Sequence, residues 1–249
     1  MTKFQVTLLR VAESRKLIKK YLDERVREPS GREVYGDHLL MCSALKWYVK
    51  AAYIDLEMEG PWAGEINRFL RDRMWVGYFY LPALNGLVVE EMKDAGRMLI
   101  KRHHFVNLAT GTIAPLDIPD ATIKGVRGEG PELLLLSGGS WEWRLFNVQS
   151  GTDRIVSSFG VDGYVSADGA YFFPVERWSS IGLVDLANGT LLDRKNKRHF
   201  SKYATKVRII QVLDFDSHEP SLTLLLMKKL ELSYRALRDE VCVRLSLVS

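Results

Sequence analysis

Cysteine is nearly absent from this 249-residue sequence: Cys42 and Cys242 are the only two, and no CxxC pair occurs. A disulfide framework needs several cysteines, and a thiolate zinc site needs ligands at short, regular spacing. The sequence therefore excludes a disulfide-stabilised secreted domain and a thiolate zinc site. We expect a reduced, cytoplasmic protein.

Long apolar segments are also missing. The longest run of aliphatic residues is Leu133–Leu136, far short of the ~20 apolar residues that a membrane-spanning helix requires. The first residues carry early charges, such as Arg10 and Glu13, and lack the apolar centre of a secretory signal. We therefore expect no membrane partner. The net charge of +4 is too small to predict a nucleic-acid partner by itself.

Motifs for catalysis are lacking as well. Gly138-Gly139-Ser140 is without the GxSxG context of a nucleophile elbow, and no glycine-rich phosphate loop occurs. We therefore predict no catalytic residue, no metal ligand and no cofactor. This favours a protein that is not an enzyme, although acidic groups converging from separate turns would escape such a test.

Residues 1–73 show helical periodicity. Apolar residues recur on one stripe over 4–26, at about 100° per residue, which predicts a helix. The alternating apolar residues of 4–8 leave a strand as the alternative for that segment. A second, central helix is predicted from 37 to near 60, and a third over 61–72, since aspartate and proline favour helix starts.

A repeated motif dominates residues 74–249. An apolar strand that ends in Asn or Asp is followed by a polar turn and a Gly-Thr pair. The motif occurs at 105–112, 146–152 and 184–190. Its glycines are 40 and 38 residues apart, and a period near 40 is typical of four-stranded propeller blades. The glycine supplies the positive φ of the turn, and the Asn or Asp bonds locally to turn backbone.

These copies resemble the β-propeller repeats of the WD40 and YVTN type, clearly over about 86–193. The sequence departs from WD40 proper, since no Trp-Asp pair closes a strand and no Gly-His pair opens a unit. The resemblance implies blade architecture and a scaffold for binding. It carries over no catalytic residue.

The expected fold class is thus α+β, with a helical module at 1–73 and a mainly antiparallel β domain at 74–249. The β domain would hold about four blade-like repeats, as an open meander or a small propeller. At ~40 residues per unit its length is near the lower limit for a closed ring. This favours the open form slightly, with the helical third covering an exposed sheet edge.

A basic stretch is the strongest candidate binding surface. From 194 to 208 the sequence has seven Lys or Arg and no acidic residue, with aromatics between them. Such a mixture suits phosphate contact with stacking, or docking on an acidic protein; a solvated loop between strands is the alternative. The candidate residues are Arg194, Lys195, Lys197, Arg198, Phe200, Lys202 and Tyr203.

Tryptophans form a second candidate surface. Trp141, Trp143 and Trp178 occupy comparable places in successive units, and indoles at one rim would anchor a partner. Core filling is the alternative reading of all three.

Two polar clusters complete the candidates. Segment 214–219 gathers three carboxylates and a histidine, ligand types suited to a cation or to acid–base chemistry, or simply an acidic turn. His103-His104 is expected at a hairpin tip, as turn residues. On a strand the two neighbours would point to opposite faces and would not bind one metal together.

The leading functional hypothesis is a non-enzymatic protein-binding protein, such as an intracellular inhibitor or immunity protein that neutralises a toxin or effector. A nucleic-acid-binding protein using the basic stretch is the first alternative. A hydrolase using Asp214 and Asp216 is the second. Fold alone decides among none of them.

Overall fold

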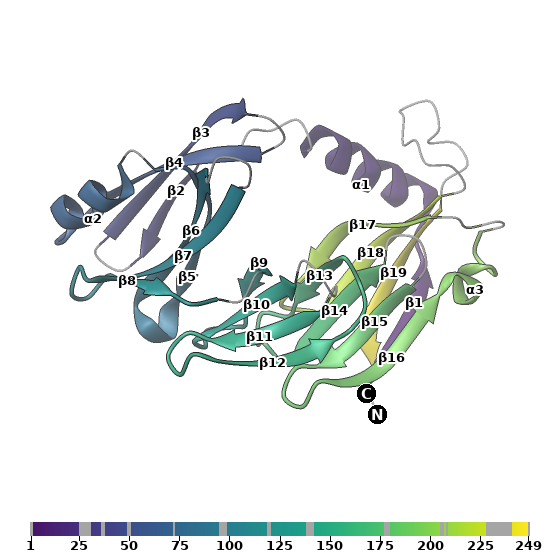
Figure 1. Cartoon of the computed structure of the whole chain (residues 1–249). Helices are drawn as coiled ribbons and strands as arrows, with labels where there is room; N and C mark the ends of the chain where they lie inside the picture. The colour runs from purple at the N-terminus through teal and green to yellow at the C-terminus, as the bar shows by residue number, and fades with distance from the viewer. Residues whose placement is uncertain are drawn as a thin grey trace.

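The computed structural model describes residues 2–24, 31–35, 38–48, 51–71, 73–94, 99–118, 121–137, 142–176, 180–204, 207, 209–227 and 241–248. Within these ranges the strands form four antiparallel sheets, which follow one another across the molecule (Figure 1). We number the sheets 1 to 4 in chain order.

Sheet 1 has seven strands and the other sheets have four each. Sheet 1 contains β2 (Gly31–Tyr35), β3 (His38–Tyr48), β4 (Ala51–Glu59), β5 (Trp75–Leu81), β6 (Gly86–Asp94), β7 (Leu99–Asn107) and β8 (Ile113–Leu116). Sheet 2 contains β9 (Ala121–Val126), β10 (Glu132–Ser137), β11 (Trp143–Asn147) and β12 (Thr152–Ser157). Sheet 3 contains β13 (Asp162–Val165), β14 (Tyr171–Glu176), β15 (Ser180–Asp185) and β16 (Thr190–Asn196). Sheet 4 contains β17 (Ile209–Asp216), β18 (Ser221–Met227), β19 (Val241–Val248) and, from the other end of the chain, β1 (Lys3–Leu8).

The helices predicted for residues 1–73 are only partly present. Segment 4–26 is divided between β1 and α1 (Val11–Glu24), so the strand alternative is confirmed for its first residues. The second predicted helix is wrong: its described residues, 38–48 and 51–59, lie in β3 and β4, which pair with each other. The third prediction is confirmed in shortened form as α2 (Ala63–Leu70).

The error in 37–54 has a physical cause. A segment that is apolar on all sides fits a strand inside a sheet as well as a buried helix, and tertiary pairing then decides. The end of β4 shows the strand period clearly, since Leu56 and Met58 are buried and the glutamates at 57 and 59 are exposed. This alternation lies within the last part of the predicted helix, which was expected to end near residue 60.

The predicted boundary between residues 73 and 74 falls between α2 and β5. Strand pairing joins the two sides of this boundary in two places. Strand β4 pairs with β5 through Ile54 and Trp75, and β1 pairs with β19 in sheet 4. That residues 1–73 form a module of their own stays a prediction.

The repeated Gly-Thr turns are confirmed as one structure used three times. The side-chain Oδ1 of Asn107 accepts hydrogen bonds from the amides of residues 109 and 110, and Asn147 does the same for 149 and 150. Asp185 accepts from the amide of Ala187. Each turn leads from the third to the fourth strand of a blade-like unit, and its glycine has a φ near +70°.

Two of these glycines form a matched pair for a test. Gly111 and Gly151 both have φ +69°, but a Cβ on Gly111 would lie 2.8 Å from Trp62, whereas one on Gly151 meets nothing within 4 Å. We expect Gly151→Ala to lower the free energy of unfolding by about 1–2 kcal/mol through backbone strain alone. Gly111→Ala loses more, because Trp62 must also shift. Urea denaturation of both variants measures the difference, and equal losses would contradict it.

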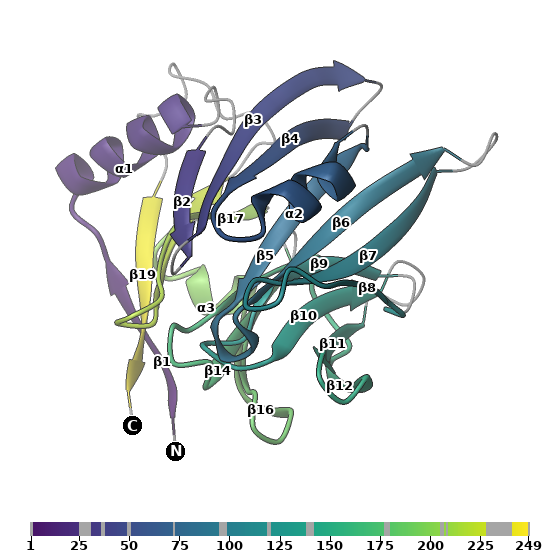
Figure 2. The ribbon, with the colours of Figure 1, turned by 90° about the vertical axis from the view of Figure 1, so that its left-hand side faces the viewer.

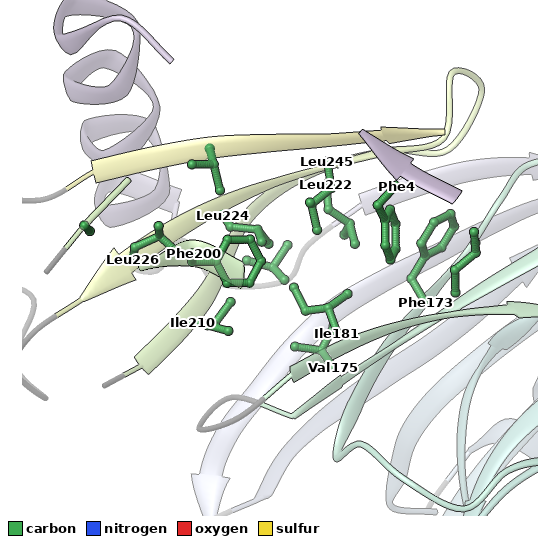
Figure 3. Packing of buried hydrophobic residues seen from close by; sticks show 14 residues of the cluster. Phe4, Phe173, Val175, Ile181, Phe200, Ile210, Leu222, Leu224, Leu226 and Leu245 are labelled. Atoms are coloured by element: carbon green, nitrogen blue, oxygen red, sulfur yellow. The ribbon is translucent and has the colours of Figure 1, made fainter. Parts of the chain in front are cut away.

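Apolar clusters join each sheet to the next one. Sheets 1 and 2 meet through Val88, Leu133 and Leu135, and sheets 2 and 3 through Trp143 and Phe172. Between sheets 3 and 4, a larger cluster places Phe173, Val175 and Ile181 opposite Leu222, Leu224 and Leu245, with Phe4 and Phe200 beside them (Figure 3).

The helices cover the outer faces of the first and last sheets. Ile18 of α1 packs on Leu225 and Cys242 of sheet 4, and α2 packs through Ile66 and Leu70 on sheet 1. Among the described residues no apolar cluster joins sheet 1 to sheet 4. The four sheets thus form a series of propeller-like units, in which α1 and α2 cover sheet faces rather than the expected edge. That the series is open rather than a closed ring stays a prediction.

Strand β1 is held in place by side chains from sheet 3 and from the segment that follows α3 (Lys197–Phe200). The Phe4 amide donates to Asp193 Oδ2 at 2.8 Å, and the Tyr203 hydroxyl donates to the Val6 carbonyl at 3.0 Å. Burial raises the pKa of the Asp193 carboxyl, but hydrogen bonds from Lys195, Phe4 and Arg194 outweigh burial and hold the pKa below its usual 3.8.

This carboxylate makes the attachment of β1 sensitive to acid. A group whose pKa is lower in the folded chain stabilises the fold fully above its unfolded pKa, and the contribution is lost as the pH falls through the folded pKa. We expect Asp193→Asn to cost about 1 kcal/mol at neutral pH and to lessen the acid-induced loss of stability. Chemical denaturation between about pH 5 and pH 2 measures this. The same acid-induced loss in wild type and variant would contradict it; Asp117→Asn, at an exposed aspartate, is the control.

Candidate active site

The β6–β7 hairpin, which Figure 2 shows from the side of sheet 1, carries two carboxylate–imidazole pairs on its opposite faces. Glu90 stands directly across from His103 in the register, on the face that packs against sheet 2. Glu91 reaches His104 on the other face, beside α2. Strand alternation thus separates two neighbouring glutamates and two neighbouring histidines into two different environments.

The first pair is part of a buried ionic group, the Glu90 cluster, which consists of Glu90, Lys101 and His103. Lys101 Nζ donates to Glu90 Oε1 at 2.8 Å, and His103 Nε2 lies 3.4 Å from Glu90 Oε2. Lys101 also donates to the Thr122 hydroxyl on β9 at 3.1 Å, which ties the cluster to sheet 2. Glu90 and His103 are only 4% and 5% exposed.

The carboxyl of Glu90 is kept ionised by its partners. Burial raises the pKa of Glu90, but the hydrogen bonds from His103 and Lys101 and their charges outweigh burial, so the pKa lies below its usual 4.5. At neutral pH the cluster therefore contains a buried carboxylate that accepts from an ammonium and from the His103 ring. Such a carboxylate fixes the orientation of the imidazole.

The second pair is enclosed by aromatic rings. His104 Nε2 lies 3.1 Å from Glu91 Oε2, which also accepts from Arg73 at 3.1 Å. Phe69 and Trp75 stand edge-on to the His104 ring, at 5.0 and 6.2 Å between centroids. Burial lowers the pKa of His104 despite Glu91. This environment suits a packing role between sheet 1 and α2.

A pocket of about 400 Å³ lies where β8 separates from β7. Strand β8 pairs with β7 only from Val106 back to His103, and the chain then leaves toward β9 through Asp117 and Ile118. The lining residues are Lys101, Arg102, His103, His104, Pro115, Leu116, Asp117 and Ile118. The pocket therefore contacts the Glu90 cluster directly.

This arrangement can move protons. Among the described residues no hydrogen-bond partner of His103 Nδ1 is found, while Nε2 faces Glu90. An imidazole held by a carboxylate through one nitrogen can take and return a proton through the other. In the described part of the chain no three His, Cys, Asp or Glu side chains gather as metal ligands.

Of the three candidate tryptophans, the structure describes Trp143 alone; Trp141 and Trp178 lie outside the described residues. Trp143 is fully buried, its Nε1 donates to the Gly160 carbonyl at 2.9 Å, and its ring lies 4.8 Å from that of Phe172. It fills the core between sheets 2 and 3 and is not on an exposed rim, because its strand faces the next sheet.

Several residues of the basic stretch are engaged within the fold. Phe200 is fully buried in the core, and Tyr203 bonds to β1. Arg194 lies over the Phe159 ring and bonds Ser180 and Glu176, and Lys195 pairs with Asp193 at 2.8 Å.

Three other basic residues of the stretch lie on or next to the short helix α3, while Lys206 and Arg208 are outside the described residues. Arg198 and Lys202 are exposed, Lys197 is half-buried, and Lys202 stacks on the Tyr203 ring at 4.8 Å. A binding role for this remaining surface stays a prediction.

The acidic segment 214–219 lines a separate trough of about 430 Å³ on the polar face of sheet 4. Asp216 Oδ1 accepts from the amides of His218 and Glu219, and these bonds lower its pKa. Asp216 thus orders the β17–β18 turn, and Asp214 lies near Lys20 of α1 at 4.0 Å.

The Glu90 cluster was not predicted from the sequence. The predicted hairpin-tip position of His103 and His104 is wrong: both residues lie in the middle of β7, which extends from Leu99 to Asn107. A signal was present: Glu90 and His103 are at equal distances from the centre of the hairpin, so a correct register places them opposite each other.

No protein-family model matches the sequence, and the search of curated proteins finds no match. The chain is similar in structure to an acylaminoacyl peptidase of Pyrococcus horikoshii, with 9% identity, TM-score 0.42, and coverage of 60% of this chain and 27% of that one. It is also similar to a luciferin-regenerating enzyme, with 12% identity, TM-score 0.45, and coverage of 89% and 78%. TolB from Acinetobacter baumannii is matched at 13% identity and TM-score 0.40, with coverage of 84% and 51%. The chain spans about a quarter of the peptidase and about half of TolB.

The leading functional hypothesis from the sequence is wrong. A non-enzymatic binding protein of the inhibitor or immunity type is contradicted by the comparison, in which the peptidase and the luciferin-regenerating protein are both enzymes. Among the described residues no helix has the length and apolar character needed to cross a membrane.

Proposed function

We propose that the chain is a hydrolase that uses His103 as its general base in the pocket beside β7 and β8. The observation that carries this proposal is the Glu90 cluster: a buried carboxylate holds one nitrogen of an imidazole that lines a pocket of about 400 Å³. Buried titratable groups with specific partners beside a pocket are typical of active sites.

The reaction that these groups support is attack of water on an acyl carbon. His103 takes a proton from the water as its oxygen bonds to the carbonyl carbon, and Glu90 stabilises the imidazolium that forms. The bond to the leaving oxygen or nitrogen then breaks, and His103 returns the proton to that atom. The products are a carboxylic acid and an alcohol or amine, so no other reactant is required.

Lys101 supports the base indirectly. Its ammonium bonds both Glu90 and Thr122, so it fixes the carboxylate relative to sheet 2 and keeps it ionised. Lys101 is therefore a positioning residue, and Glu90 orients the base.

The direct test is hydrolysis of a small panel by the full chain. The panel contains p-nitrophenyl acetate, p-nitrophenyl phosphate, p-nitrophenyl glucoside and an acyl-p-nitroanilide. We expect turnover of the acyl substrates above the buffer rate, because water activated by a general base attacks acyl carbons. Turnover of the phosphate or the glucoside alone, or of none of the four, would overturn the proposal.

A further inference from the structure

The region of the pocket also contains an unpaired strand edge. Strand β7 pairs with β6 along its whole length, from Leu99 to Asn107, but with β8 only over His103–Val106. Figure 2 shows the β6–β7 hairpin continuing well beyond β8. Among the described residues, no strand pairs with Leu99–Arg102 on the side that β8 has left.

The register identifies which backbone groups face this open side. Asn107 donates its amide to Thr112 across the β7–β8 turn, at 2.9 Å. Hydrogen bonding alternates along an antiparallel strand, so odd-numbered residues of β7 point their N–H and C=O toward β8. Pro115, which has no N–H, stands opposite the even-numbered His104, as this pattern requires. The amides and carbonyls of Lys101 and Leu99 therefore point into the open edge.

We propose that the pocket binds an extended peptide segment, which adds as a strand to β7 in place of the departed β8. Unpaired strand edges bind extended chains through alternate backbone bonds. Ile100 is 42% exposed on this stretch and offers apolar contact. Lys101 and Arg102 follow Ile100 along the strand and lead to His103, so the added peptide runs past the proposed base.

The inference deepens the proposed function, because it names peptides as the substrate class of the same pocket. The peptide carbonyl that pairs with the Lys101 amide is polarised by that bond, next to His103. Peptide binding itself depends on the edge and not on the acid–base step.

The experiment uses the full chain carrying His103→Gln, so that bound peptides are not consumed. A tryptic digest of casein is passed over the immobilised variant, and retained peptides are identified by mass spectrometry. The peptide retained in highest yield is then synthesised in two forms, each N-methylated at one of the two alternate sets of amides. We expect one form to lose at least tenfold in affinity and the other to stay within about twofold of the parent.

A variant of the protein tests the same edge. The Leu99 amide faces the open side, so Leu99→Pro removes a donor without breaking a bond to β6. We expect binding to weaken about two- to tenfold with little change in thermal unfolding. Retention of no casein peptide, or equal effects of the two methylation sets, would overturn the inference.

The two proposals fail separately. Peptide binding with the alternate methylation pattern, but no hydrolysis by the wild type, overturns the hydrolase and supports the peptide site. Turnover of acyl esters with no casein peptide retained overturns the peptide class and supports the hydrolase.

Discussion

Replacement of His103 by glutamine lowers kcat/KM for acyl substrates by about 10²- to 10⁴-fold, the contribution that a general base makes. Glutamine keeps a polar side chain of similar length in the pocket but cannot take the proton from water. We expect the loss mainly in kcat, because the pocket still binds substrate. Steady-state kinetics of the wild type and the variant separates kcat from KM.

The matched control is His218→Gln. His218 is exposed in the β17–β18 turn, far along the chain from the pocket, and only its backbone amide takes part in the turn. This variant should keep its activity. If the fraction of His103→Gln that is unfolded accounts for all of its lost activity, the buried pair of Glu90 and His103 would serve only to stabilise the fold.

Replacement of Trp143 by alanine destabilises the chain by about 3–5 kcal/mol, which is the range for a large buried aromatic residue. The indole is fully buried between sheets 2 and 3, and its removal also leaves the Gly160 carbonyl without its donor. A loss of this size is comparable to the whole stability of many domains. Calorimetry and urea denaturation of the variant give the value.

Trp62→Ala is the comparison for Trp143→Ala. Trp62 is 37% exposed and its Nε1 donates to the Ala109 carbonyl at 3.1 Å. We expect Trp62→Ala to lower the free energy of unfolding by much less than Trp143→Ala, because the partly exposed Trp62 ring buries less apolar surface in the folded chain. Similar losses would show that the cluster around Trp143 relaxes to fill the cavity.

The parts of the fold that local chemistry controls were predictable from the sequence. The Asn or Asp and the Gly of each repeat act within a single turn, so their spacing alone indicated the blade-like units. The strand alternative for 4–8 also followed from local alternation.

The parts that depend on distant partners were not predictable in the same way. Segment 37–54 is apolar on all sides, and pairing between β3 and β4 decides its structure. Trp143 gives no local sign of its burial, since an indole in a strand serves equally at a rim or between sheets.

The candidate site could not be predicted without the register of the β6–β7 hairpin. Glu90 and His103 are thirteen residues apart and carry no motif, and only the β6–β7 alignment brings them together. Lys101 reaches Thr122 on the next sheet, a contact that no pattern along one strand contains.

The pairing of β1 with β19 has a consequence for the order of events during synthesis. Strand β1 is synthesised about 230 residues before β19. Its backbone N–H and C=O groups and the Phe4 side chain therefore have no partner in sheet 4 until β19 has been translated. Sheet 4 is the last to be completed, and any chain that stops before residue 241 leaves its leading strand without a place to bind. Completion of sheet 4 therefore depends on one late pairing, that of β1 with β19.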